Sequence, residues 1–182
     1  MMKEDASLIT QLLSSLTGDW RCTRATQADQ AVLREVFAST RQIELSLLPP
    51  DQVQRDVFIA VQMQAQRRSV AAHYPGAVEL LIHHQGQVAG RLWLHEDEAG
   101  VRVLDITVLP AFQRQGGART CLHTLLHLAD AMGRATHLHV MIDNPVRHWY
   151  ARLGFDTQGA AGLYQAMTRL PTVVMETQHE QA

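Results

Sequence analysis

The chain has 182 residues, of which 46% are hydrophobic and 19% are charged, and its formal net charge is −2 at pH 7. This length and composition suit a globular domain with a sizeable core and exclude a disordered protein. The positive charge is carried almost entirely by arginines scattered from Arg21 to Arg169, so we expect no nucleic-acid partner.

The first part of the chain predicts three helices and one short strand. Apolar residues fall on one face of 5–17, which predicts a helix that either packs on its own domain or contacts a second subunit in a homodimer. A strand at 20–25 precedes a second helix, whose start is indicated by Thr26 and Asp29 in a capping-box pattern. A third helix runs from Asp51 to about Ala72, and its expected inward face carries Val53, Val57, Phe58, Val61 and Ala65.

From residue 78 the hydrophobic period becomes that of strands. Segments 78–84, 87–95 and 101–108 predict an antiparallel meander. An amphipathic helix from Gly117, a strand at 137–143, a short helix at 144–154 and a last strand at 163–170 follow. We therefore expect residues 1–18 to form a helical extension, 19–172 one domain and 173–182 a flexible tail.

The two cysteines, Cys22 and Cys121, are too few for a disulfide framework and form no CxxC pair, which favours a reduced, cytoplasmic setting. The first residues lack the long apolar core and the cleavage site of a signal peptide. No apolar run approaches the ~18 residues of a membrane-spanning helix, so we expect a soluble protein without a membrane partner.

The most informative segment is QRQGGA at 113–118, between the end of a strand and the start of a helix. The first turn of a helix carries unpaired N–H groups and the positive end of the dipole, which together bind anions. Gly116 and Gly117 allow close approach of a ligand, and Arg114 and Arg119 add positive charge. The alternative is an ordinary glycine turn. A Walker loop is excluded because the segment has no lysine, and a dinucleotide fingerprint because GxGxxG is absent.

This segment resembles the acetyl-CoA-binding motif of the GNAT acetyltransferase superfamily, commonly written Arg/Gln-x-x-Gly-x-Gly/Ala. Gln113, Gly116 and Ala118 occupy its three fixed positions. Arg119 follows where the family often has serine or threonine, which departs from the family pattern but is electrostatically compatible with phosphate.

A second match lies 26 residues further on, in NPVRHWYARLGF. It resembles the second coenzyme A motif of the family, an asparagine followed by a helix that ends in Tyr-x-x-Leu-Gly-Phe. The matching residues are Asn144, Tyr150, Leu153, Gly154 and Phe155. Asn144 can cap this helix and Gly154 can close it. The two motifs together span 104–155, whereas residues 1–100 resemble the family only in the order of their elements.

The resemblance implies an α/β (α+β) fold with a mixed, mostly antiparallel seven-stranded sheet flanked by helices, here with an extra N-terminal helix. The fourth and fifth strands, 101–108 and 137–143, would splay apart and hold the pantetheine arm of acetyl-CoA, while the pyrophosphate would bind the N–H groups of 113–118. The implied cofactor-binding residues are Ile106, Thr107, Val108, Gln113, Arg114, Gln115, Gly116, Gly117, Ala118, Arg119, Asn144 and Tyr150.

The resemblance also implies direct attack of a primary amine on the thioester. Tyr150 stands at the usual position of the acid that protonates the leaving thiolate, or alternatively it packs and hydrogen-bonds the cofactor sulfur. Asp105 lies on the strand that commonly carries a carboxylate base, although it could instead pair with Arg91 on the neighbouring strand. Glu79 and a water relay are further candidates for the base.

Histidines suggest a metal site that the sequence does not complete. His123 and His127 lie four residues apart on one predicted helix, a spacing that can chelate zinc. Thr124 stands where a metalloprotease has glutamate, and the sequence offers no convergent third ligand. We therefore expect a solvated surface and no metal.

We expect an N-acetyltransferase that uses acetyl-CoA as cosubstrate and a small-molecule or peptide amine as acceptor. The alternative from another functional class is a GNAT-fold module that binds coenzyme A without catalysis, as a sensor or docking subunit. The acceptor pocket is expected to include residues 38–52, where Glu44 and Asp51 are possible partners of the amine.

Overall fold

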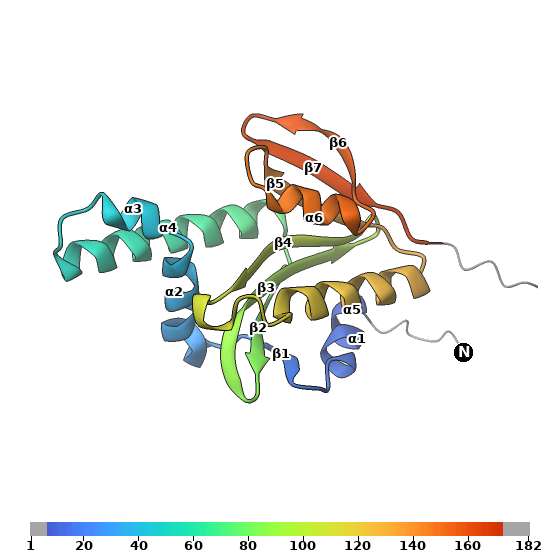
Figure 1. Cartoon of the computed structure of the whole chain (residues 1–182), viewed down its shortest axis with the longest axis horizontal. Coiled ribbons are helices and arrows are strands. Elements are labelled where there is room, and N and C mark those ends of the chain that lie inside the picture. The colour runs from blue at the N-terminus through green and yellow to red at the C-terminus, as the bar shows by residue number, and fades with distance from the viewer. Residues whose placement is uncertain (1–6, 173–182) are drawn as a thin grey trace, which may run out of the picture.

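A seven-stranded sheet runs through the middle of the molecule in the computed structural model, which describes residues 7–172 (Figure 1). The strands are β1 Trp20–Arg24, β2 Val78–His84, β3 Gln87–Asp97, β4 Gly100–Val108, β5 Thr136–Met141, β6 Asp156–Ala161 and β7 Tyr164–Arg169. Their order is β1-β2-β3-β4-β5-β7-β6, and β4–β5 is the one parallel pair within this range. The expected mixed, mostly antiparallel α+β sheet is thereby confirmed.

Helices cover both faces of this sheet, and two hydrophobic clusters fill the space between them. The helices are α1 Leu8–Ser15, α2 Gln30–Ser39, α3 Gln42–Ser46, α4 Gln52–His73, α5 Gly117–Ala131 and α6 Val146–Arg152. One cluster joins α1, α5 and α6 to the sheet, and the other joins α2 and α4 to its opposite face. Helix α3 and the first half of α4 extend away from the sheet, at the left of Figure 1.

Side chains cap the first turn at two helix starts, and the first of them is the predicted capping box. The hydroxyl of Thr26 accepts from the N–H of Ala28, and the carboxylate of Asp29 accepts from the N–H of Thr26, so the capping box is formed at the turn that leads into α2. Asp51 caps α4 by accepting from the N–H of Val53 at 2.9 Å. Each cap satisfies backbone donors that the first turn of a helix leaves unpaired.

Helix α1 packs on its own domain, which was the first of the two expected alternatives. Leu8, Ile9 and Leu12 are buried in the cluster shared with α5. The carboxylate of Glu96 in β3 accepts from the hydroxyl of Ser7 at 2.6 Å and from the N–H of Leu8 at 3.0 Å. The apolar face of this helix is therefore used inside the subunit.

The predicted inward face of α4 is wrong. Val53, Val57 and Val61 expose 70%, 57% and 58% of their surface, and Ala65 is exposed as well, while Phe58 is half-buried. The buried residues are Ile59 and Met63, which pack against α2 and β2. Both sets repeat every four residues on opposite sides of the helix, so periodicity alone does not distinguish the inner stripe from the outer one.

Strand β6 is absent from the elements that the hydrophobic pattern predicts. All six residues of Asp156–Ala161 are exposed, so no alternation of apolar side chains marks this edge strand, and pairing with β7 defines it. Residues 1–6 of the expected extension and the predicted tail at 173–182 lie outside the described residues. Within 7–172, no helix combines the length and the apolar character needed to cross a membrane.

Candidate active site

The site begins where β4 and β5 part. The two strands pair only from Val101–Thr136 to Val103–Leu138. At that point the register between β3 and β4 shifts. Leu94 of β3 pairs with Val103, but its neighbour Trp93 pairs with Asp105. Leu104 therefore has no partner in β3 and forms a β-bulge. A bulge of this kind bends and twists its strand. We attribute the divergence of β4 from β5, which the family resemblance implied, to this bulge.

A cavity of about 470 Å³ lies in this divergence. Its wall brings together Asp105 and Ile106 from β4, His139 from β5, Asn144 from the turn before α6, and Tyr150 from α6. Arg41 and Gln66 approach it from the side of α3 and α4. The two predicted catalytic residues, Asp105 and Tyr150, therefore line one space although they come from different elements.

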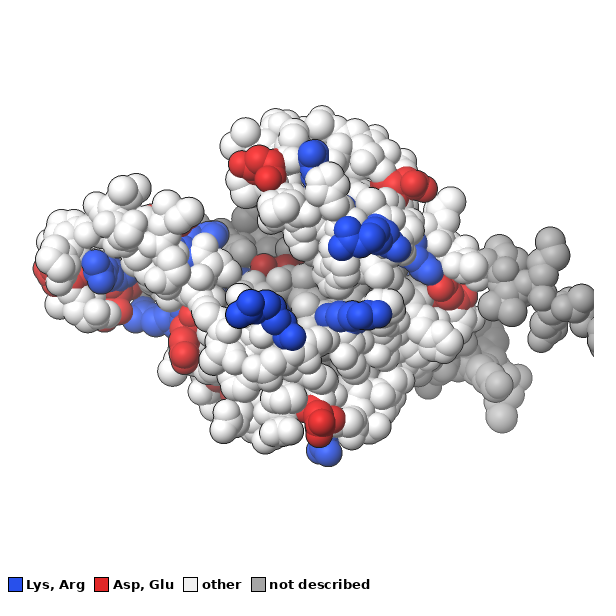
Figure 2. Space-filling model, viewed as in Figure 1, with Lys and Arg blue, Asp and Glu red and all other residues white. Residues whose placement is uncertain are grey.

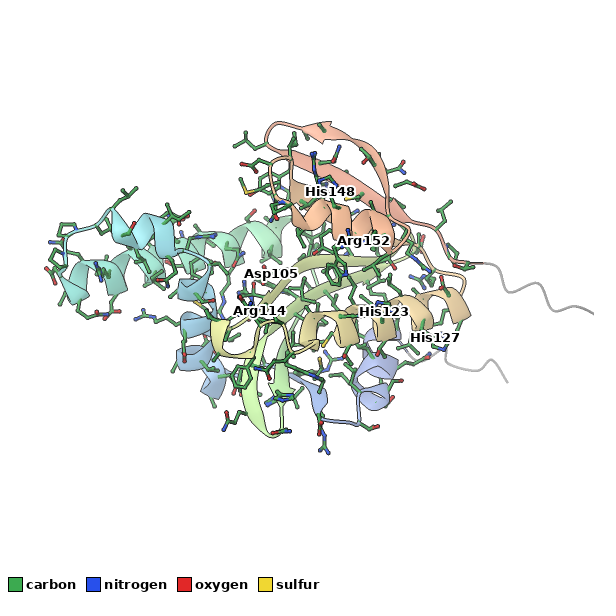
Figure 3. The ribbon with its side chains drawn as sticks, viewed as in Figure 1. Asp105, Arg114, His123, His127, His148 and Arg152 are labelled. Carbon is green, nitrogen blue, oxygen red and sulfur yellow. The ribbon has the colours of Figure 1, made fainter. Side chains whose placement is uncertain are left out.

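A second hollow, of about 240 Å³, lies at the start of α5. It is lined by Val108, Phe112, Gln113, Arg114, Gly116, Gly117, Ala118, Arg119 and Trp149. Ala118 and Trp149 line the cavity between the strands as well, so the two spaces adjoin. Figure 2 shows arginine or lysine side chains on this face of the molecule, and Figure 3 shows Arg114 near the start of α5 and Arg152 on α6.

The backbone of the 113–118 turn has the shape of an anion cradle. Arg114 has a φ of +61° and Gly116 a φ of +90°, both left-handed. Alternation into the left-handed region turns successive N–H groups toward one concave side. A Cβ added to Gly116 would meet no atom within 4 Å, so the space in front of it is open.

Gly117 has a packing role that the sequence did not indicate. A Cβ at this position would lie 2.4 Å from the ring of Trp20 on β1. The second glycine of the turn therefore lets α5 begin directly against the sheet. Of the two glycines, Gly116 faces the open space and Gly117 faces the core.

The open edge of β4 exposes backbone groups of alternate residues. The N–H of Leu109 donates to the backbone carbonyl of Ala89 in β3 at 2.8 Å. Because backbone groups alternate sides along a strand, Thr107 also faces β3, and Ile106 and Val108 face the gap. The side-chain amide of Gln113 donates to the carbonyl of Val108 at 3.0 Å. The N–H of Val108 and both groups of Ile106 are thus the groups of this edge that face a ligand in the gap.

Other implied cofactor residues serve local structure. The amide of Gln115 donates to the carbonyl of Ala111 at 2.9 Å, and Gln115 lies outside the walls of both spaces. Asn144 accepts from the N–H of Val146 at 3.0 Å, so it caps α6 as predicted while it lines the cavity.

Tyr150 is held in the core with its side chain in the cavity wall. It is 7% exposed, and its ring packs edge-on against Phe155 at 5.8 Å between centroids. Burial, and secondarily the negative charge of Asp105, raise the pKa of Tyr150 to about 12. Its phenol therefore keeps its proton at neutral pH and can act as an acid.

Asp105 forms the ion pair with Arg91 that was its alternative role. The Arg91 guanidinium, 1% exposed, lies 2.9 Å from Oδ2 of Asp105 and donates to Glu79 at 3.1 Å. Thr107 donates its hydroxyl to the same carboxylate, 3.2 Å from Oδ1 and 3.1 Å from Oδ2. Arg67 also contacts Glu79, at 3.2 Å. Asp105 remains partly exposed to the cavity, whereas Glu79 lies outside its wall and is held between two arginines.

The sequence profile of the "Acetyltransferase (GNAT) family" matches residues 41–155, which is more than half of the chain. The chain belongs to the GNAT family of acetyltransferases. No curated protein matches it.

Solved structures share the fold at low sequence identity. The paia N-acetyltransferase from Thermoplasma acidophilum, solved in complex with coenzyme A, is 14% identical with a TM-score of 0.61, over 83% of this chain and 98% of that one. The ribosomal-protein-S18-alanine N-acetyltransferase from Escherichia coli is also 14% identical, with a TM-score of 0.59, over 87% and 97%. Ard1 from Thermoplasma volcanium is 16% identical, with a TM-score of 0.56, over 85% and 99%. These likenesses show the GNAT fold.

His139 is a site residue that the sequence analysis did not select. Its side chain lines the same cavity as Asp105 and Tyr150. Partial burial lowers the pKa of His139 below its ordinary value of 6.5, and the charges of Arg102 and His137 lower it further. Nη1 of Arg102 lies 3.5 Å from Nδ1, at the outer limit of a hydrogen bond, so it does not fix which nitrogen carries the hydrogen. A neutral imidazole in this GNAT cavity can accept a proton.

The expected amine partners of the 38–52 segment are not in the cavity wall. Glu44 lies in α3, 3.8 Å from Arg41, and Asp51 caps α4. From this region Arg41 lines the cavity, joined by Gln66 from α4. Of the 38–52 segment, the structure thus brings Arg41 to the cavity wall and leaves Glu44 and Asp51 outside it.

His123 and His127 lie on the exposed side of α5, as expected for a solvated surface (Figure 3). Within 7–172, no three His, Cys, Asp or Glu side chains come together in an arrangement that could hold a metal ion.

Proposed function

We propose that this protein transfers the acetyl group of acetyl-CoA to a primary amine by direct attack of the amine on the thioester. The observation that carries the proposal is the continuity of two spaces, an anion cradle at 113–118 and a cavity that contains Asp105 and Tyr150. One long ligand with phosphates at one end and a reactive group at the other fits both.

In this proposal the pyrophosphate binds the N–H groups of the 113–118 turn, where the dipole of α5 and the charges of Arg114 and Arg119 favour an anion. The pantetheine arm follows the open edge of β4 and pairs with the N–H of Val108 and with Ile106. The thioester then lies in the cavity beside Tyr150. A backbone N–H of the same edge can stabilise the oxyanion that forms on the thioester carbonyl.

The acceptor enters from the side of Arg41 and Gln66. Asp105 is the negative group of the cavity, and we assign it the role of orienting the amine, which is cationic in water because its pKa is near ~10. The neutral imidazole of His139 takes the proton that the amine loses. The amine nitrogen bonds to the acetyl carbon, the carbon–sulfur bond breaks, and the Tyr150 hydroxyl gives its proton to the sulfur. The nitrogen then loses its second proton to the Tyr150 oxygen, which restores the hydroxyl.

This division of roles follows from the partners of Asp105. Its Oδ2 is occupied by Arg91, so the amine contacts Oδ1, which accepts from the Thr107 hydroxyl at 3.2 Å. The cavity accepts a small-molecule or peptide amine. We assign the protein to the cytoplasm because Cys22 and Cys121 are both free thiols.

The test measures binding and turnover separately. Acetyl-CoA at ~100 times its dissociation constant is expected to add ~2.7 kcal/mol to the free energy of unfolding, visible as a rise in melting temperature. An amine library, with peptides included, is then assayed for release of free coenzyme A thiol. Stabilisation without turnover of any amine would support the sensor or docking alternative, and no stabilisation would overturn the coenzyme A site itself.

A further inference from the structure

Four charged side chains on the acceptor side of the cavity form a network whose charges balance. Arg67 and Arg91 contact the carboxylate of Glu79, at 3.2 and 3.1 Å. Arg91 also contacts the carboxylate of Asp105, at 2.9 Å. Two guanidinium charges and two carboxylate charges therefore cancel, and the network as a whole brings no net charge to the cavity.

Arg41 lies in the cavity wall outside this network, and its charge is only weakly compensated. Its Nε lies 3.8 Å from Oε1 of Glu44 in a pair whose side chains are 32% and 47% exposed, and exposed pairs contribute little. Nη1 donates to the carbonyl and to the hydroxyl of Thr40, both at 3.3 Å, and the guanidinium lies 4.8 Å from the ring centroid of Phe37. These contacts orient the guanidinium. Within 7–172, its Nη2 has no hydrogen-bond partner and is available to a ligand.

Gln66 of α4 adds a second donor to this side of the wall. Its amide oxygen accepts from Nη2 of the buried Arg91 at 3.3 Å. Because a guanidinium only donates hydrogen bonds, this contact fixes the oxygen of Gln66 toward Arg91 and leaves its NH2 group for another partner. No residue of the described part of the chain accepts from that NH2 group. Arg41 and Gln66 therefore bring two sets of unused donors to one side of the cavity.

This distribution of charge favours an acceptor that carries a negative group of its own. A simple alkylamine enters as a cation and would add a second positive charge beside Arg41. An anionic group on the same molecule would neutralise Arg41 while Asp105 still orients the amine. A carboxylate fits better than a phosphate monoester, because its single charge equals that of one guanidinium and its planar oxygens match it. A phosphate monoester would bring a charge of about −1.5 to −2.

The strand side of the cavity offers an apolar surface. Met141 of β5 pairs with Tyr164 of β7, and both side chains line the cavity. They expose 38% and 50% of their surface, so an apolar group of a ligand could cover them and gain from leaving water. The same wall thus holds a carboxylate for an amine, donors for an anion and a surface for an apolar group.

We propose that the acceptor is a free α-amino acid with an apolar side chain. The inference rests on the proposed function, because it names the acceptor of the same transfer. Arg41 and Gln66 bind the carboxylate of the amino acid, and Asp105 orients its amino group. Met141 and Tyr164 contact its side chain. The chemistry is the transfer described above, with an N-acetyl amino acid and free coenzyme A as products.

The first experiment compares acceptors that differ at the carboxylate. Leucine, leucinamide and isoamylamine form one series, and phenylalanine, phenylalaninamide and phenethylamine form a second. Release of coenzyme A thiol at saturating acetyl-CoA gives kcat/KM for each compound. The wild-type protein is expected to prefer each amino acid over its amide about thirtyfold, as loss of a charge-assisted contact predicts. An equal or higher kcat/KM for the amides would overturn the inference.

Two variants and a matched control test the residues. Gln66→Glu keeps an oxygen that can accept from Arg91 but replaces the NH2 donor with an acceptor, so it should repel the carboxylate. Arg41→Gln removes the positive charge. Each variant is expected to bring the kcat/KM of an amino acid and of its amide to within about threefold of each other. Arg34→Gln removes the same charge from an exposed position of α2 outside the cavity wall and should retain the preference. Retention of the full preference in Arg41→Gln and Gln66→Glu would overturn the assignment.

The outcomes separate this inference from the proposed function. If amides or plain amines are acetylated as well as the amino acids, acetyl transfer stands and the role of the carboxylate fails. If other amines are acetylated and amino acids are not, the inference fails in the same way. If no amine with or without a carboxylate is acetylated, the proposed function fails and the inference fails with it.

Discussion

Two regions of the molecule meet at the cavity and differ in how they are built. The proposed coenzyme region comprises β4, the 113–118 turn, α5, β5 and α6, and the proposed acceptor region comprises α2, α3 and α4 on the other face of the sheet. The coenzyme region forms its surface from backbone groups of short continuous segments. The acceptor region presents side chains from separate helices, Arg41 and Gln66.

A short stretch of sequence is enough to determine the shape of the first region but not that of the second. A turn that bends through left-handed residues and opens a helix has the same shape wherever it occurs, because its own residues fix it. The position of a side chain at the acceptor side depends on how α3 and α4 lie against the sheet. Five substitutions test this contrast between the two regions.

Gly116→Glu should abolish binding of acetyl-CoA. The new side chain would occupy the open space in front of the turn, repel the pyrophosphate and meet a φ of +90° that an L-residue rarely adopts. The matched control is Gly86→Glu, which has a φ of +85° and equally open surroundings on the β2–β3 turn. Calorimetry should find no binding for the first variant and unchanged binding for the second. Equal affinity in both would place the coenzyme elsewhere.

Arg91→Leu should unfold the molecule more easily, because Arg91 joins the two regions. Its guanidinium contacts Asp105, Glu79 and, at 3.3 Å, Gln66 of α4. Removal of one partner from a buried ion pair leaves the other charges uncompensated, at a cost of about 3–5 kcal/mol. Urea denaturation measures the loss, with Arg147→Leu, at a partly exposed position, as control. A cost under about 1 kcal/mol would mean that the cavity side of this network is well hydrated.

The elements that the sequence predicted correctly are those whose pattern has one interpretation. The capping box at Thr26, the end of β4 at Val108 and the turn from 113 to 118 are local, and the structure has each of them. The face of α4 was wrong because its two apolar stripes are equivalent in sequence.

Three further features depended on contacts between distant segments. Strand β6 has no buried residue to mark it, and the bulge at Leu104 arises from the register with β3. His139 became a site residue only when the separation of β5 from β4 opened a cavity beside it. Strand alternation places it opposite the buried Leu138 and Val140, which is the signal that could have drawn attention to it.

Tyr150→Phe should lower turnover about a hundredfold and leave binding of acetyl-CoA nearly unchanged. The lost hydroxyl acts in the transition state, and the effect lies at the low end for a general acid because water can partly replace it. The ring still packs on Phe155, so the free energy of unfolding should change by under about 1 kcal/mol. Steady-state kinetics and a binding titration measure the two effects. Weakened binding with unchanged turnover would assign Tyr150 to holding the cofactor.

His139→Gln should lower kcat about tenfold at neutral pH and alter the pH profile. The pKa of His139 lies below 6.5, so the ring is neutral at higher pH and gains a proton as the pH falls through that lowered value. With saturating substrates the wild-type kcat should therefore fall on the acid side, and this fall should be absent in the variant. At moderately alkaline pH the Tyr150 hydroxyl should keep its proton, because its pKa is about 12. We therefore expect no fall in kcat there from deprotonation of Tyr150. An equal fall of kcat at acid pH in the wild type and the variant would exclude His139 as the proton acceptor.

Val57→Thr should have the smallest effect, a change within about ±0.5 kcal/mol in the free energy of unfolding. Val57 exposes 57% of its surface on the outer stripe of α4, and threonine has nearly the same shape and helix propensity. Ile59→Ala, two residues along the same helix, should cost about 2–5 kcal/mol because Ile59 is buried against α2 and β2. Urea denaturation of both variants measures which stripe faces the protein. If the two costs were reversed, the stripe predicted from periodicity would be the inner one, and α4 would lie rotated by nearly half a turn. Gln66 would then leave the cavity wall, and the acceptor side of the site would have to be rebuilt from other residues.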